Sequence, residues 1–144
     1  MVLVCSPTSI DNEICNIWPE TQTVAEVVPA RAREFLTQAI ASLSAPAGAV
    51  MLSASAVDAM LKDKGYRDGS LCSRIDQAAT AHLITPEMAM WAHEIRLDAN
   101  DQRHADETSA LPNEADAQKS IDFVKTLAQF LYVLPASVER GRTS

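Results

Sequence analysis

The stretch from 91 to 106, WAHEIRLDANDQRHAD, holds the densest set of chemically versatile side chains in the chain. Within it Arg96, Asn100 and His104 are spaced four residues apart, which places them on one face if the stretch is helical. Such a row can bind a phosphate, with arginine as a fixed cation, asparagine as an orienting amide and histidine as a proton donor or acceptor. These three are therefore the candidate catalytic residues.

The same row has a simpler structural interpretation. Arg96 would pair with a nearby acid, Asn100 would tie its helix to a neighbour, and His104 would hydrogen-bond across the bundle. Both interpretations stay open from the residues alone. If the row does bind a ligand, His93 and Arg103 are the neighbouring residues expected to contribute to ligand binding.

The sequence contains no motif typical of a metal site, a cofactor site or a catalytic nucleophile. His93, Glu94, Asp98, Asp101 and His104 are ligand types, but none stands at the HExxH spacing and no glycine fits a calcium loop. The chain also lacks a glycine-rich phosphate loop and a GxSxG motif. We therefore expect no metal site and no cofactor.

The three cysteines, Cys5, Cys15 and Cys72, form no CxxC pair, so they predict neither a disulfide framework nor a zinc ribbon. They are typical of reduced cytosolic thiols. Cys72 follows a helix start, but His82 is ten residues away, which is poor geometry for a nucleophilic pair within one helix. We expect Cys72 to be a packed thiol.

The composition indicates one soluble domain. The 144 residues are 47% apolar and 22% charged, and the net charge of -7 opposes general binding to nucleic acid. Aromatic content of 5% and only 4 glycines argue against a β-sandwich or barrel. No apolar stretch approaches the ~20 residues of a membrane span, and the first residues lack the charge of a secretory signal. We expect a cytoplasmic protein with no membrane contact.

Five segments show helical apolar spacing, and the loops between them are short. They cover residues 29–43, 47–64, 71–82, 86–96 and 113–134, with the end of the fourth helix left open. Ser44, Ser70, Thr85 and Asn113 are expected to cap helix N-termini, and Gly65 to take the left-handed position after a C-terminus. The pattern predicts an all-α fold, an antiparallel bundle of about five helices.

The chain divides into three parts. Residues 1–28 have weak periodicity and predict an extended N-terminal arm, residues 29–135 form the helical bundle domain, and residues 136–144 are a polar C-terminal tail. The last helix carries two adjacent apolar stripes, which is more than one neighbouring helix needs. Either this helix is the core of the bundle or part of it faces a second subunit, and we expect a homodimer.

Three segments of the chain resemble a known family. LKDKG followed by LCSRIDQ, then LITPEMAMWAHEIRLDANDQRH, then FVKTLAQFLYVLPASVER are similar in order to a bacterial domain-of-unknown-function family placed with the HEPN-like helical domains. The resemblance covers about residues 18 to 140. It implies an α-helical bundle that commonly dimerises, found alone or fused to restriction or other defence proteins.

The resemblance also implies a test for catalysis, because active HEPN ribonucleases cleave RNA without metal, using an arginine, a polar residue and a histidine at a dimer interface. Asn100 and His104 match the polar residue and the histidine. Ala99 stands where the nuclease arginine would be, and Arg96, one turn earlier, would have to substitute.

On the second helix, paired arginines of the family correspond here to Ala54 and Ser55, while Asp58 keeps the acidic position. The missing cations favour a non-catalytic interaction module, a homodimer with a protein partner in defence or regulation. Two alternatives use the row of Arg96, Asn100 and His104. One is a metal-independent endoribonuclease, and the other is a binder of a nucleotide or another anionic ligand.

Overall fold

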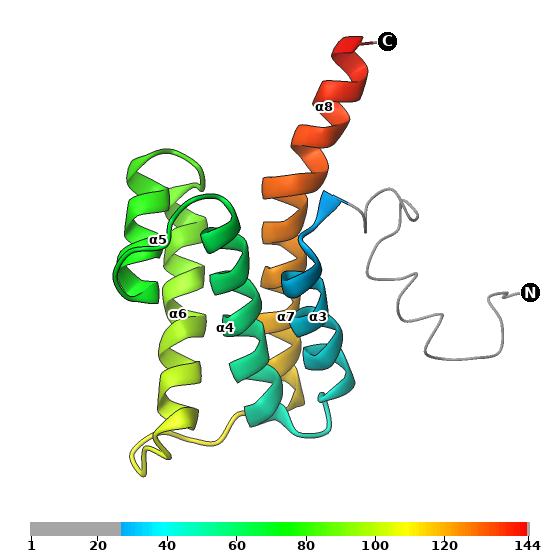
Figure 1. The fold of residues 1–144 in the computed structure, drawn as a ribbon. Helices are drawn as coiled ribbons and strands as arrows, with labels where there is room; N and C mark the ends of the chain where they lie inside the picture. Colours follow the sequence, from blue (N-terminus) through cyan, green and yellow to red (C-terminus); the bar gives the residue numbers. More distant parts are fainter. Residues whose placement is uncertain (1–26, 144) are drawn as a thin grey trace, which may run out of the picture.

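The structure is a computed structural model that describes residues 27–143, and all regular structure within that range is helical (Figure 1). The elements are α3 Ala30–Ala41, α4 Pro46–Asp63, α5 Leu71–Thr80, α6 Pro86–Arg103, α7 Glu114–Ala128, the π-helical turn η1 Gln129–Val133, and α8 Leu134–Thr143. The predicted all-α bundle of five helices is confirmed, because α7, η1 and α8 form one continuous helix. The N-terminal arm predicted for residues 1–28 lies outside the described residues, except for its last two.

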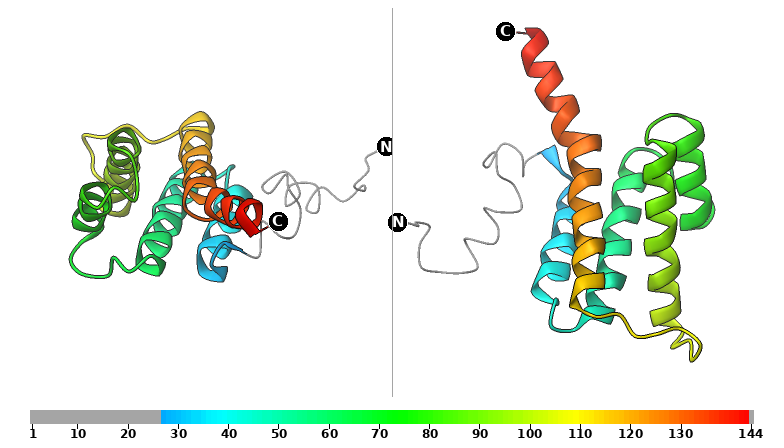
Figure 2. Two further views of the ribbon diagram at one scale, coloured as in Figure 1. Left: turned by 90° about the horizontal axis from the view of Figure 1, so that it is seen from above. Right: turned by 180° about the vertical axis from the view of Figure 1, so that it is seen from behind.

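Helix α4 occupies the centre of the bundle. It packs against α3 and α7 on one side and against α6 on the other, and successive long helices run in opposite directions (Figures 1 and 2). Eight of its residues are buried, which fits a helix with a single charged residue, Asp58, between Ala47 and Leu61. Phe123 of α7 is fully buried and lies 4.8 Å from the ring of Trp91 on α6, between ring centroids. Each such buried large side chain contributes roughly 1.5–3 kcal/mol.

Three of the four predicted N-terminal caps are present. The side chains of Ser70 and Thr85 accept the backbone N–H groups three residues on, at 3.2 and 3.0 Å. Asn113 forms a reciprocal capping box with Asp116. The prediction for Ser44 is wrong, since α4 is preceded by Ala45 and begins with Pro46, whose fixed φ starts the helix without a side-chain cap.

Three helices, α4, α5 and α6, end in the same C-terminal motif. Gly65 has the predicted left-handed φ of +103°, and the N–H of Tyr66 reaches back to the carbonyl of Leu61 at 3.0 Å. The same motif closes α5 and α6, but there the left-handed residues are His82, with φ +63°, and Ala105, with φ +52°. The expected place of His82 on a helix face is therefore wrong: α5 ends at Thr80, and His82 is an exposed turn residue.

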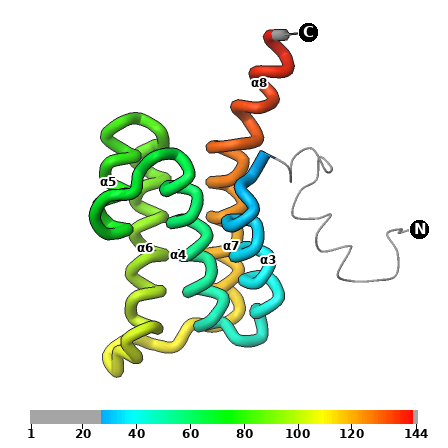
Figure 3. Tube along the Cα trace, viewed as in Figure 1, coloured from blue at the N-terminus to red at the C-terminus, as the bar shows by residue number. Residues whose placement is uncertain are grey.

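The last helix continues past the proline at which the bundle domain was expected to end. Pro135 lacks an N–H and its ring would clash with the carbonyl of Leu131 in a regular α-helix. The wider π-helical turn just before it accommodates this conflict. Residues 136–143, expected as a polar tail, are helical and project beyond the bundle as α8 (Figure 3).

The continuous helix Glu114–Arg142 is long and apolar enough to cross a membrane by length and composition, with a mean hydropathy of 1.2 over its best window. In the bundle, 44% of that window is buried. A core helix of a soluble protein passes the same test, so this is weak evidence for a membrane span.

Candidate functional site

A pocket of about 450 Å³ opens between α4, the N-terminus of α5 and the second half of α6. Its polar lining includes three arginines from two helices, Arg74, Arg96 and Arg103. Asn100 of α6 and Ser55 of α4 line it as well. The pocket therefore gathers several cations in a chain whose net charge is negative.

The structure brings together two of the three residues of the predicted row. Arg96 and Asn100 lie one turn apart on α6 and both line the pocket. His104 is the C-cap of α6 and is exposed, outside the pocket lining. The His104 N–H still bonds to the Asn100 carbonyl at 3.1 Å, so His104 continues the row along α6, but it lies one turn beyond Asn100 and past the end of the pocket.

Arg96 and Arg103 keep their positive charges free of carboxylate partners within residues 27–143. Arg103 donates to the side-chain oxygen of Asn100 at 3.2 Å, and Arg96 Nε donates to His93 Nδ1 at 3.1 Å. Both acceptors are neutral groups, so the two guanidinium charges remain uncompensated. Such groups are well suited to bind a phosphate or carboxylate.

Arg74 is a pocket residue that the sequence analysis did not select. Its side chain is buried, forms an ion pair with Asp58 at 2.7 Å and also donates to the Gly69 carbonyl. Lys62 makes a second ion pair with Asp58 at 3.1 Å. A signal did exist, because a lone acid on a mostly buried helix needs a cation. Arg74 therefore fixes α5 on α4, and its charge is already matched.

The N-terminus of α5 adds a favourable field for an anion. Ser70, Leu71 and Cys72, which form its first turn, line the pocket. The N–H groups of a first turn have no partner inside the helix, and the helix dipole makes this end partially positive. The field of α5 and the free charges of Arg96 and Arg103 thus favour the same sign of ligand.

The positions highlighted by the family resemblance meet at this pocket. Ala54, Ser55 and Asp58 of α4 lie across from Ala99 and Asn100 of α6, and all five are lining residues. The small side chains of Ala54 and Ser55 leave space that arginine side chains at these positions would fill. The α4 side of the pocket therefore contributes no cation, and the unpaired positive charges of the pocket come from α6.

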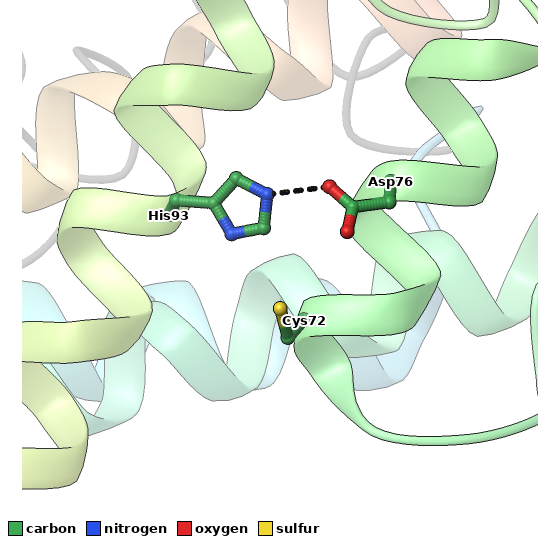
Figure 4. A group of neighbouring side chains, drawn as sticks. All are labelled: Cys72, Asp76 and His93. Atoms are coloured by element: carbon green, nitrogen blue, oxygen red, sulfur yellow. Dashed lines mark hydrogen bonds and ion pairs between the residues drawn. The ribbon is translucent and has the colours of Figure 1, made fainter.

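His93 belongs to a second group of side chains, which adjoins the pocket and shares Cys72 with its lining. It lies with Cys72 and Asp76 of α5, and each offers one ligand atom within 4.8 Å of the others (Figure 4). His93 Nε2 is 2.8 Å from Asp76 Oδ1. Among the described residues, this is the one group of three such side chains close enough to share an ion. Ligand spacing within one segment does not predict this group, because its members come from two helices.

Comparison with known proteins gives one match. Residues 36–142 match the family model described as "Domain of unknown function (DUF4145)". No curated protein and no solved structure matches the chain.

Proposed function

The chain belongs to the DUF4145 family of domains of unknown function, and on that basis we propose that it is a non-catalytic, HEPN-like interaction module that forms a homodimer. It works in the cytoplasm with a protein partner in defence or regulation. The observation that carries the proposal is an exposed apolar stripe on the part of the last helix that projects from the bundle.

The stripe consists of Phe130, Leu134 and Val138, whose exposed fractions are 38%, 53% and 59%. The spacing of four residues places them on roughly one side of the helix. They extend over about 12 Å of helix, at 1.5 Å per residue. Isolated exposed apolar residues are ordinary, but an aligned set at the tip of a helix is typical of an interaction surface.

A second copy of the chain is the occupant that suits this surface. Within residues 27–143, α8 packs closely only against η1, the turn that directly precedes it in the same helix. As the free end of a longer helix, α8 leaves the apolar side chains of Leu134 and Val138 exposed to solvent. In a two-fold dimer the same stripe meets itself, so one apolar surface supplies both halves of the contact.

Sedimentation of the purified chain over a range of concentrations tests this proposal. The chain is expected to form a dimer, and the double substitution Leu134→Glu and Val138→Glu should give a folded monomer. Leu111→Glu is the matched control, because Leu111 is 82% exposed but lies in the loop before α7. A monomer at all concentrations, or a dimer that tolerates both glutamates, would contradict the proposal.

A second candidate function is binding of a phosphate-bearing ligand, favoured by the two uncompensated charges of Arg96 and Arg103. A ligand that binds only the folded state raises the melting temperature. We expect such a rise with nucleotides for the unmodified chain, and its loss in Arg96→Ala with Arg103→Ala. The control Arg142→Ala removes an exposed charge on α8, far along the chain from the pocket. A flat melting temperature across the nucleotide panel excludes this function.

The endoribonuclease alternative has a stricter requirement. His104 lies outside the pocket of its own chain, so a composite site would need the histidine from a second protomer. Cleavage of single-stranded RNA in the presence of EDTA, lost in His104→Ala, is the outcome this alternative requires.

A further inference from the structure

We propose that Cys72, Asp76 and His93 form a binding site for a divalent transition-metal ion such as Zn²⁺, between α5 and α6. The three supply a thiolate, a carboxylate and an imidazole, which are the ligand types that zinc takes in proteins. Their ligand atoms already lie within 4.8 Å of one another (Figure 4).

The backbones that carry these ligands are fixed by core packing. Cys72 and Asp76 are four residues apart on α5, so they share one face. Between them, Ile75 is fully buried and Arg74 is held by Asp58 at 2.7 Å. On α6, His93 follows the buried Ala92. Ligands mounted on rigid, packed helices keep their relative positions without the metal.

The separations suit zinc after small side-chain rotations. Bond lengths of about 2.0–2.3 Å in a tetrahedral site place neighbouring ligand atoms roughly 3.3–3.8 Å apart. The widest separation must therefore shrink by about 1 Å, while the Asp76–His93 contact of 2.8 Å must open by a smaller amount. Asp76 is exposed and the other two are half-buried, so an ion can enter and water can complete its coordination.

A nucleophilic Cys–His pair is the competing interpretation of the same three residues. Both ring nitrogens of His93 are engaged, Nε2 by Asp76 at 2.8 Å and Nδ1 by Arg96 at 3.1 Å. Neither nitrogen is left to act as a base toward Cys72. A metal ion needs no such base, because it favours the thiolate directly as the thiol proton leaves to solvent.

Arg96 gives the proposal a distinctive consequence. Because Nδ1 of His93 accepts from Arg96, the neutral ring carries its proton on Nε2, facing Asp76. When a metal takes Nε2, that proton moves to Nδ1 and faces the Arg96 N–H, so Arg96 must turn away. Arg96 therefore competes with the metal, both as a donor and as a neighbouring positive charge.

Cobalt titration of the full chain tests the site, with Cys5→Ser and Cys15→Ser so that Cys72 is the single thiol. In a non-thiol reductant, Co²⁺ should give thiolate-to-cobalt charge-transfer absorption that saturates at one ion per chain and is displaced by Zn²⁺. Cys72→Ser should abolish the absorption. Asp76→Asn and His93→Gln should weaken Co²⁺ binding by at least about tenfold.

Two further variants separate this site from an adventitious one. Arg96→Met should tighten Co²⁺ binding, whereas a merely structural Arg96 would give no gain. His104→Gln, an exposed histidine at the end of the same helix, should leave binding unchanged. The proposal is overturned if the folded chain, checked by circular dichroism, shows no charge-transfer absorption and no Zn²⁺-dependent rise in melting temperature. Co²⁺ binding of unchanged affinity in His93→Gln also overturns it.

Discussion

Arg96 Nε donates a hydrogen bond to His93 Nδ1 across 3.1 Å, and this bond connects the cationic pocket to the Cys72–Asp76–His93 group. One side chain thus serves both candidate sites. An anion that draws Arg96 into the pocket frees His93, and a metal on His93 frees Arg96 for an anion. Such coupling is reciprocal in binding free energy.

Sulfate is expected to strengthen Co²⁺ binding by a few-fold, because it draws Arg96 away from His93 and screens its charge. In Arg96→Met this enhancement should disappear. The measurement is the Co²⁺ titration in sulfate against chloride at equal ionic strength. Equal enhancement in both proteins would show that the two sites are independent.

The Arg74–Asp58 ion pair is expected to stabilise the fold rather than to bind ligand. Arg74→Met should lower the free energy of unfolding by about 2–4 kcal/mol, because it leaves Asp58 with the half-exposed Lys62 alone. Arg103→Met, at an exposed pocket position, should change it by less than about 0.5 kcal/mol. Urea denaturation measures both. A loss of similar size in the two variants would contradict this division of roles.

Ala105→Gly should stabilise the chain by about 1 kcal/mol. Ala105 has a φ of +52°, a conformation that costs a residue with a Cβ roughly 1–2 kcal/mol and glycine very little. Gly65→Ala, at the equivalent position after α4, should destabilise by a similar amount. The melting temperature is expected to rise in Ala105→Gly and to fall in Gly65→Ala. A lower melting temperature in both variants would show that the greater conformational entropy of glycine in the unfolded chain outweighs the strain at Ala105.

Asp98→Asn should raise the melting temperature at neutral pH. Partial desolvation raises the pKa of Asp98, and the neighbouring carboxylates Asp101, Asp116 and Glu94 raise it further, against the opposing charge of Lys119. A folded pKa above the unfolded value means that the ionised form costs stability, and the cost disappears as the pH falls through the raised pKa. The gain is about 0.5 kcal/mol, because the group is exposed.

Asp106→Asn is the matched contrast. Hydrogen bonds from Thr108 lower the pKa of Asp106, so its ionised form favours folding above the unfolded pKa, and that contribution is lost at lower pH. Its substitution should therefore lower the melting temperature at neutral pH. Thermal melts of both variants from neutral to acid pH distinguish the two carboxylates, whose effects should converge on the unmodified chain in acid.

Much of the fold could be predicted because its signals are local. Thr85 and Pro86 start α6, and Asn113 starts α7, through contacts that reach only three residues along the chain. The isolation of Asp58 in an apolar helix correctly indicated that α4 is central. Such features depend on neighbours in sequence, so spacing alone identifies them.

The candidate site was predicted less completely because it depends on where helices end and cross. Arg96 and Asn100 line the pocket, but His104, one turn further along at the exposed end of α6, lies beyond it. The group of Cys72, Asp76 and His93 joins residues 21 positions apart through the packing of α5 against α6. The pattern of residues within one segment therefore could not predict this contact between two helices.

The π-helical turn at Gln129–Val133 also sets the orientation of everything that follows it. An α-helix advances by about 100° per residue, so a turn holding one extra residue rotates the downstream side chains by that angle relative to α7. In unbroken α-helical phase, Leu134 and Val138 would lie on the same side as the buried Leu127, because spacings of seven and eleven residues return to one face. The one-residue offset instead turns them outward, so a one-residue deletion in this turn should abolish the proposed self-association without removing any apolar side chain of α8.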